Sequence, residues 1–168
     1  MVEAPLLRPE ERRRNIFVSP ALAGELAGRN LARALPFGAI RENLIGPFVR
    51  GEVLTISWTR REQRSSSRRN RHHPQLEKLE GYDEIWVLCQ REPRPGWRLS
   101  GRFLSKDVLV LLDFRHKDEI GNNYASVSAS VIHQWQRLFG CRLPHTGTDI
   151  SGYVGGTFSD YDELMRSR

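Results

Sequence analysis

The chain has few cysteines and no long run of apolar residues. Only two of its 168 residues are cysteine, Cys89 and Cys141, and such low use is typical of a reducing compartment. No apolar run approaches the roughly 20 residues that span a bilayer, which argues against a transmembrane helix. The N-terminal residues MVEAPLLRPEERRR lack the apolar core of a secretory signal peptide. We therefore expect a cytoplasmic protein that does not enter a membrane.

Patterns typical of metal ligands are also scarce. The adjacent residues His72 and His73 point in different directions on most backbones, and no cysteine or carboxylate stands at ligand spacing around them. The sequence therefore predicts neither a metal site nor a cofactor.

The residues that are present are typical of one folded domain with a basic excess. Hydrophobic residues make up 39% of the chain and charged residues 27%, which is enough for a core in a single domain. The formal net charge is +6. Such an excess favours an anionic partner, namely RNA, DNA, the ribosome or an acidic protein.

The segment 60–71 concentrates this charge. It reads RREQRSSSRRNR and contains six arginines and no apolar residue. Because like charges at this density repel one another unless a partner binds them, we interpret the segment as an electrostatic tether for a phosphate backbone. The alternative is a solvated loop without a partner. The predicted nucleic-acid contacts are Arg60, Arg61, Arg64, Arg68, Arg69 and Arg71, together with Arg102.

The stretch 83–117 predicts an antiparallel β-meander. β-Branched and aromatic residues fill three runs, 84–90, 97–104 and 108–114, and the residues between them are typical of turns. We expect an α+β fold in which helices pack against this small antiparallel sheet.

Two registers of the last hairpin are compatible with the sequence. With a two-residue turn, Arg98 lies opposite Arg115. With a three-residue loop, Arg98 lies opposite Phe114 and shares a face with His116. A slip of one residue moves every side chain to the other face, so both registers stay open. Either one gathers cationic groups at one end of the sheet, where a phosphate would relieve their repulsion; otherwise the side chains extend into water.

The remaining elements are predicted from apolar spacing and from the positions of glycine and proline. We expect helices over 20–35, 74–80 and 125–139 and a strand over 52–59, with no regular pattern over 36–51. The single domain then consists of a helical or irregular extension (1–51), a core of sheet and helix (52–140) and a glycine-rich tail (141–168). The tail is expected to dock through Tyr153, Phe158 and Tyr161.

The order of these parts resembles the catalytic end of RelE/HigB-like toxins, the small ribosome-dependent mRNA interferases of type II toxin–antitoxin systems. In the segment 83–124, the strands EIWVLCQR, GWRLSGRF and DVLVLLDF precede a basic cluster, RHKDE, and a tyrosine. Members of that family carry an arginine on the middle strand and a basic cluster after the last strand, with a tyrosine or histidine soon after in some of them. The matching positions are Arg98, Arg115, His116, Lys117 and Tyr124.

The resemblance implies that mRNA is cleaved on the ribosome through attack by its own 2′-OH, without a metal or cofactor. Such a site must move protons and stabilise charge on the phosphoryl oxygens. Arg98 and Arg115 suit the phosphoryl oxygens because guanidinium groups match their geometry. His116 suits proton transfer because the ordinary pKa of histidine lies near neutrality. Lys117 would add charge, and Tyr124 would stack on a base or donate a proton.

Two other functions fit the same residues. The protein could bind nucleic acid without cleaving it, through its arginines and through Trp58, Trp86 and Trp97, although core packing is the simpler role for Trp86 and Trp135. It could instead present a basic face to an acidic protein such as an antitoxin. The basic cluster lacks the paired lysines before a proline that many HigB-like members show, which leaves binding without cleavage open.

Overall fold

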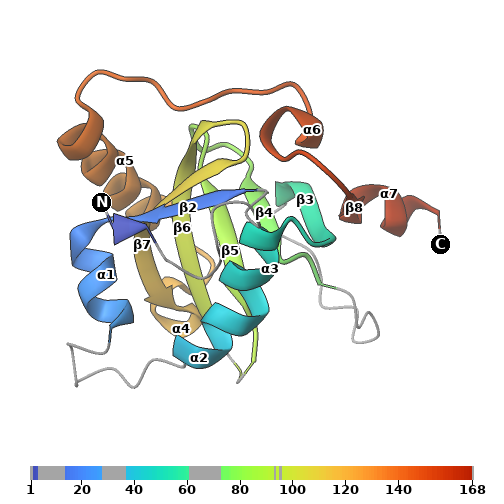
Figure 1. Ribbon diagram of the computed structural model, residues 1–168, viewed down its shortest axis with the longest axis horizontal. Coiled ribbons are helices and arrows are strands. Elements are labelled where there is room, and N and C mark those ends of the chain that lie inside the picture. The colour runs from blue at the N-terminus through green and yellow to red at the C-terminus, as the bar shows by residue number, and fades with distance from the viewer. Residues whose placement is uncertain are drawn as a thin grey trace.

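A computed structural model describes residues 2–3, 14–27, 37–60, 73–92, 94 and 96–167. The eight strands in this part of the chain form one sheet in the order β1-β2-β7-β6-β5-β4-β3-β8 (Figure 1). The strands are β1 (Val2–Glu3), β2 (Asn15–Val18), β3 (Leu54–Arg60), β4 (Leu76–Leu79), β5 (Trp86–Gln90), β6 (Trp97–Ser105), β7 (Val108–His116) and β8 (Phe158–Asp160). The helices are α1 (Pro20–Leu26), α2 (Phe37–Ile40), the π-helical turn η2 (Arg41–Ile45), α3 (Gly46–Arg50), α4 (Lys117–Ile120), α5 (Ala125–Phe139), α6 (Ile150–Tyr153) and α7 (Tyr161–Arg166). The predicted α+β class is confirmed.

The predicted meander forms the centre of the sheet. Strands β5, β6 and β7 pair antiparallel as expected, and β4 adds a fourth antiparallel strand. The whole sheet is mixed, because β2 pairs in parallel with β7 and β3 pairs in parallel with both β4 and β8. The prediction of a small, purely antiparallel sheet is therefore wrong. The parallel pairs join segments far apart in the sequence, so the residue pattern of a single segment does not predict them.

The hairpin between β6 and β7 has the two-residue turn. Ser105 pairs with Val108, and Asp107 adopts a φ of 63°, the left-handed conformation that tight hairpin turns require. The register shifts twice along the hairpin and then returns to its first alignment, so that Arg98 pairs with Arg115. Of the two registers that the sequence left open, this one is present.

Helices cover both faces of the sheet. On one face, α2, η2 and α3 pack over the strands in a core that includes Phe48 and Trp86. On the other face, α5 buries Val127, Val131 and Trp135 (Figure 1). The helix predicted over 125–139 is thus confirmed with its apolar stripe. Both faces of β5 and β6 are consequently buried, including the face that carries Arg98.

Two segments next to the meander differ from their predicted structure. Residues 74–80, predicted as a helix, contain β4, because pairing with β3 and β5 overrides the local helical preference. Residues 36–51 have no regular apolar pattern, yet residues 37–50 form α2, η2 and α3.

The N-terminal part is more than an extension of the core. Strand β2 lies inside the sheet next to β7, so the predicted boundary at residue 51 divides the sheet itself. The helix predicted over 20–35 is α1, which ends at Leu26, and residues 28–36 lie outside the described residues.

The glycine-rich tail docks on the sheet as predicted. We call residues 141–157 the strap, since they run from α5 past the end of the sheet to β8 (Figure 1). Tyr153 and Tyr161 are buried, and Phe158 packs against the core. The buried Arg14 fastens the strap from below, because its Nη2 atom donates to the carbonyl oxygen of Gly155 at 2.8 Å.

Candidate nucleic-acid interface

Four of the five predicted catalytic residues meet at the end of the sheet where β6 begins and β7 ends. We call Arg98, Arg115, His116 and Lys117 the cationic rim. Arg98 and Arg115 are partners across the β6–β7 ladder, and His116 is the partner of Trp97. Lys117 follows directly as the first residue of α4.

Arg98 is the buried member of the cationic rim, with 4% of its surface exposed. Its Nη1 atom donates to the carbonyl oxygens of Gln90 and Trp97 at 3.1 and 2.9 Å. Among the residues that the structure describes, its Nε atom has no hydrogen-bond partner and no carboxylate pairs with its guanidinium. Arginine keeps its proton in proteins, and a buried charge without a counter-ion is costly. The rim therefore contains an uncompensated positive charge.

Arg115, in contrast, has a carboxylate partner. Its Nε atom donates to Asp113 Oδ2 at 2.9 Å, and its Nη1 atom donates to Ser126 Oγ at 3.0 Å. Asp113 also accepts from Ser130 Oγ at 2.8 Å. Because Ser126 and Ser130 belong to α5, this network joins the end of β7 to the helix above it. The side chain of Arg115 is 25% exposed, so part of it reaches solvent.

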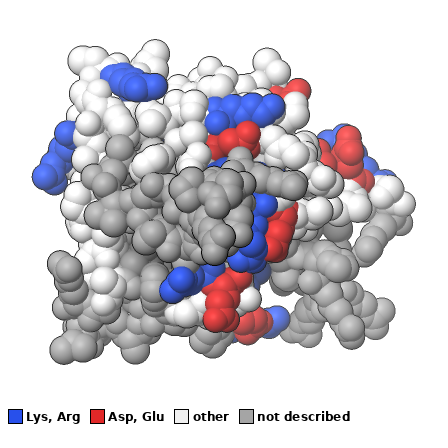
Figure 2. Space-filling model, in the orientation of Figure 1, with Lys and Arg blue, Asp and Glu red and all other residues white. Residues whose placement is uncertain are grey.

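His116 and Lys117 complete the cationic rim at the surface. The ring of His116 packs edge-on against Trp97 with 4.8 Å between the ring centroids, and its Nδ1 atom lies 3.6 Å from Asp118 Oδ2. Lys117 Nζ donates to the carbonyl oxygen of Gly121. On the face drawn in Figure 2, the Lys and Arg side chains in the centre and at the right lie beside Asp and Glu, whereas those at the left and upper left stand apart from them. Arg98 is thus the buried charge of the rim, and in the described part of the chain it lacks a balancing carboxylate.

Two predicted contact residues are buried. Tyr124 is 2% exposed and packs in the core beneath α5, so its ring offers no face on which a base could stack. Arg102 is 3% exposed, and its Nη2 atom donates to the Asp83 carboxylate at 2.9 Å. Its guanidinium also lies 5.9 Å from the ring centroid of Trp135 on α5. Neither residue presents surface to RNA, because Arg102 lies on the sheet face that α5 covers and Tyr124, the N-cap residue of α5, packs into the same core.

The predicted arginine tether lies outside the described residues. Strand β3 ends at Arg60, whose side chain is not described, and the structure resumes at His73. The five positions without a described structure are Arg61, Arg64, Arg68, Arg69 and Arg71.

The sequence analysis missed a second basic group beside Arg98, which we call the His73 cluster: His73, Arg91 and Arg94. Continuing the β4–β5 register places His73 opposite Arg91. Arg91 Nη2 donates to a carboxylate oxygen of Glu77 at 2.6 Å. The buried Nε atom of Arg91 has no hydrogen-bond partner within the described ranges. The sequence hid this cluster because residues 74–80 were predicted as a helix, which separates His73 from Arg91.

Burial and the arginines around His73 lower its pKa. Burial lowers this pKa most, the Arg91 charge lowers it further, and the Arg94 and Arg98 charges act in the same direction. The Glu77 carboxylate opposes them. A guanidinium can lower the pKa of an imidazole only where it is near enough to repel the added proton. The cationic rim and the His73 cluster therefore share the charge of Arg98.

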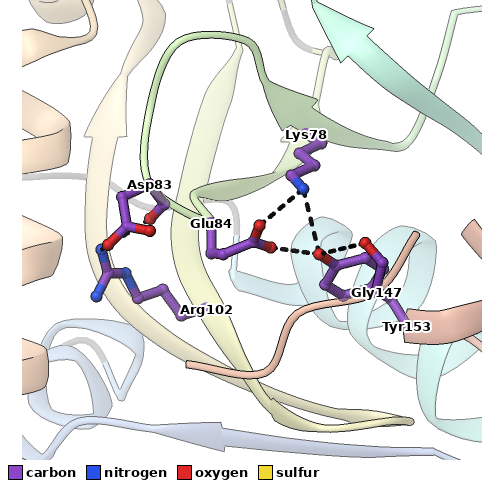
Figure 3. Close-up of polar contacts among 6 residues, drawn as sticks. All are labelled: Lys78, Asp83, Glu84, Arg102, Gly147 and Tyr153. Atoms are coloured by element: carbon purple, nitrogen blue, oxygen red, sulfur yellow. Dashed lines mark hydrogen bonds and ion pairs between the residues drawn. The ribbon is translucent and has the colours of Figure 1, made fainter. Parts of the chain in front are cut away.

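A third polar group lies near the opposite end of the strands, under the strap (Figure 3). Lys78 Nζ donates to Glu84 Oε1 at 2.9 Å and to Tyr153 Oη at 3.2 Å, while Tyr153 Oη donates to Glu84 Oε2. Glu84 reaches this position from a backbone φ of 52°, which is strained for a residue with a Cβ atom. Its neighbour Asp83 points the other way, toward Arg102 (Figure 3).

Titration of this group follows from its contacts. Burial disfavours the charged ammonium of Lys78, but the hydrogen bonds to Glu84 and Tyr153 outweigh it and raise its pKa. Burial, followed by the hydrogen bond to Glu84, raises the pKa of the Tyr153 hydroxyl. Each of the three side chains thus has protein partners that satisfy it, and we assign the group the role of fastening the strap to the sheet.

The described residues show no sign of a metal site or a membrane span. No group of three or more His, Cys, Asp or Glu side chains among them could hold a metal ion. None of the helices in the described ranges is both long enough and apolar enough to cross a bilayer.

Comparison with known proteins adds no family to this geometry. The resemblance to RelE/HigB-like toxins depends on the order of three strands and the basic residues after them. No protein-family model matches the chain, and no curated protein or solved structure is significantly similar to it.

Proposed function

We propose that the protein binds RNA at the cationic rim, and that the phosphate backbone supplies the counter-charge that Arg98 lacks. The observation that carries this proposal is a guanidinium that is 4% exposed and has no carboxylate partner in the described part of the chain. A protein that never bound an anion here would bear the cost of this buried charge without a compensating gain.

A phosphate backbone fits the surroundings of Arg98 better than an acidic peptide does. Guanidinium groups bind phosphate oxygens through paired hydrogen bonds, and Arg115 stands beside Arg98 with part of its side chain in solvent. The segment 60–71 carries six arginines and one glutamate, so it supplies most of the formal excess of +6. Non-specific binding of single-stranded RNA combines such charge with aromatic groups. At the rim, the partly exposed ring is that of His116, which packs against the buried Trp97.

Replacing Arg115 with alanine is expected to weaken binding of a short single-stranded RNA about three- to ten-fold, because one phosphate contact is lost. The slope of log affinity against log salt should also fall by about one phosphate contact. Fluorescence anisotropy over a series of salt concentrations measures both quantities. Arg137→Ala on the exposed surface of α5 is the matched control and should leave both unchanged. Affinity that does not depend on salt, or equal losses in the two variants, would contradict the proposal.

Cleavage of the bound RNA is a second candidate function, and the position of His116 favours it. Its side chain is 28% exposed, its ring rests on Trp97, and the Asp118 carboxylate stands 3.6 Å from Nδ1. A partly exposed imidazole with a carboxylate nearby is suited to take and return a proton. Arg115, the residue before His116, points to the opposite face of β7, toward α5. Its guanidinium would stabilise the charge that develops when a 2′-OH attacks the adjacent phosphate, if the RNA crosses the end of the sheet between the two side chains.

We expect the protein to cut RNA in the presence of a metal chelator and to leave a 2′,3′-cyclic phosphate end. His116→Gln should slow this cleavage at least about ten-fold and lower RNA affinity much less, because proton transfer is removed whereas binding loses only one aromatic ring. Gel analysis of end-labelled RNA, with and without ribosomes, measures the rate. His133→Gln, at an exposed position of α5, is the control. If the wild-type protein binds RNA but never cuts it under either condition, RNA binding remains its function and cleavage is rejected.

A further inference from the structure

We infer that the His73 cluster is a second phosphate subsite, in which Arg91 and Arg94 contact a phosphate group and Arg98 supplies charge from below. The inference rests on the proposed function and extends it, because the RNA would then cross the ends of β7, β6, β5 and β4. The sequence did not predict this part of the interface.

The register of the sheet places the two sites side by side. Arg98 pairs with Cys89 on β5, and Arg91 lies two residues beyond Cys89 on the same face. Arg91 is therefore a diagonal neighbour of Arg98, within reach for long side chains. Arg115 on β7 and Arg91 after β5 are two strand spacings apart, about 10 Å, and Arg115 and His73 are three spacings apart, about 14 Å. An RNA that places one phosphate at Arg115 and the next at the His73 cluster would span this distance.

The donors of the His73 cluster suit an oxyanion. Arg91 is 30% exposed and Arg94 is 84% exposed, so both guanidinium groups reach solvent. The Nε atoms of Arg91 and Arg98 have no acceptor in the described ranges, but both are buried, so a phosphate would be bound by the exposed nitrogens of Arg91 and Arg94. Two carboxylates oppose an anion here. Glu77 pairs with Arg91 at 2.6 Å and Glu92 with Arg94 at 3.3 Å.

These pairs leave one positive charge in excess. Each carboxylate offsets one arginine, and Arg98 has no such partner among the described side chains. Its charge is buried, where the effective dielectric constant is lower than in water and attraction to a nearby anion is stronger. A phosphate over Arg91 and Arg94 would sit in this field and would accept hydrogen bonds from the solvent-facing guanidinium groups.

His73 provides a spectroscopic readout for the subsite, independent of any cleavage. His73 reaches solvent, although neighbouring atoms partly desolvate its ring. The charges of Arg91, Arg94 and Arg98 also disfavour its protonated form, while Glu77 favours it. A bound phosphate would cancel part of the arginine field. The imidazole should then titrate at a higher pH when phosphate is bound.

The test is an NMR titration of the histidine rings of the whole chain, with His73 and His116 assigned through His73→Gln and His116→Gln. The probes are inorganic phosphate and a short single-stranded RNA, each compared with sodium chloride at equal ionic strength. We expect both probes to raise the pKa of His73. Arg91→Gln should weaken phosphate binding about ten-fold, because a charged donor is lost. Arg94→Gln, at an exposed side chain that folding does not need, should weaken it several-fold, and Arg137→Gln should not.

The outcomes of this titration distinguish failure of the second subsite from failure of the proposed RNA binding at the cationic rim. If RNA perturbs His116 but neither probe perturbs His73, the second subsite is rejected and RNA binding at the rim stands. If only inorganic phosphate perturbs His73, the site takes a small free phosphate and the inferred RNA path is overturned. If RNA perturbs neither ring and does not bind, the proposed function itself fails. Equal perturbation of His73 in wild type and in both arginine variants would also reject the subsite.

Discussion

Arg98→Met is expected to raise the free energy of unfolding by about 1–3 kcal/mol and to weaken RNA binding about ten- to a hundred-fold. The stability should rise because methionine fills a similar volume without placing an uncompensated charge between the sheet and α5. The loss of hydrogen bonds to the carbonyl oxygens of Gln90 and Trp97 limits this gain. The affinity should fall because the buried charge that attracts phosphate is gone.

Arg102→Met is the matched control for this substitution. Arg102 lies on the same strand and the same face, is 3% exposed and, like Arg98, has a buried Nε atom without a described acceptor. It differs in having Asp83 as an ion-pair partner at 2.9 Å. Because Asp83 is itself 71% exposed and can return to water, we expect a stability change within about 1 kcal/mol. RNA affinity should not change.

Urea unfolding and RNA anisotropy on the two variants measure these effects. A rise in stability together with a loss of affinity at Arg98 alone would identify a charge kept for binding at the expense of stability. If Arg98→Met destabilises the protein by several kcal/mol and binds RNA as wild type does, then Arg98 is a structural residue and the proposed interface is wrong.

The burial of Arg98 could not be predicted from the sequence. The hairpin pattern correctly predicted three strands and, as one of two registers, the pairing of Arg98 with Arg115. It could not show that α5 covers the face on which Arg98 and Arg102 lie. A strand with apolar residues on one face and arginines on the other is predicted to expose the arginine face to solvent. Burial of that face depends on where a helix distant in the sequence packs, which the strand's own residues do not show.

Local patterns succeeded where one segment alone determines the structure. The stripe of Val127, Val131 and Trp135 is long enough to specify α5 without its partners. The segment 74–80 is too short to specify its own structure, and β4 forms there because it pairs with β3 on one side and β5 on the other. The same error hid the His73 cluster, since a strand places His73 opposite Arg91 and a helix does not. The parallel pairs β2–β7 and β3–β8 each join segments that are about 90 to 100 residues apart in the sequence, so no local pattern predicts them.

Tyr153→Ala is expected to lower the free energy of unfolding by about 3–5 kcal/mol. The ring is fully buried and lies 4.8 Å from Trp86 and 5.4 Å from Phe103, measured between ring centroids. Its removal leaves a cavity beneath the strap and takes one hydrogen-bond partner from Lys78. RNA affinity of the folded protein should change little, because the cationic rim lies at the other end of the strands. A large loss of affinity at unchanged stability would contradict this assignment.

Tyr153→Phe keeps the ring and removes only the hydroxyl, so it should cost about 1–2 kcal/mol at neutral pH. It should also change the response to alkali. The pKa values of Tyr153 and Lys78 are raised in the folded protein above their ordinary values of 10.0 and 10.5. The folded state therefore binds more protons than the unfolded state once the pH passes about 10. Stability from both groups is complete below that pH and declines as the pH rises toward the folded pKa values. Urea unfolding at a series of alkaline pH values measures this effect. The free energy of unfolding should decline less steeply with pH in Tyr153→Phe than in wild type, because the contribution of the tyrosine hydroxyl is absent. Identical slopes in the two proteins would rule out the Lys78–Glu84–Tyr153 network as the contact that fastens the strap.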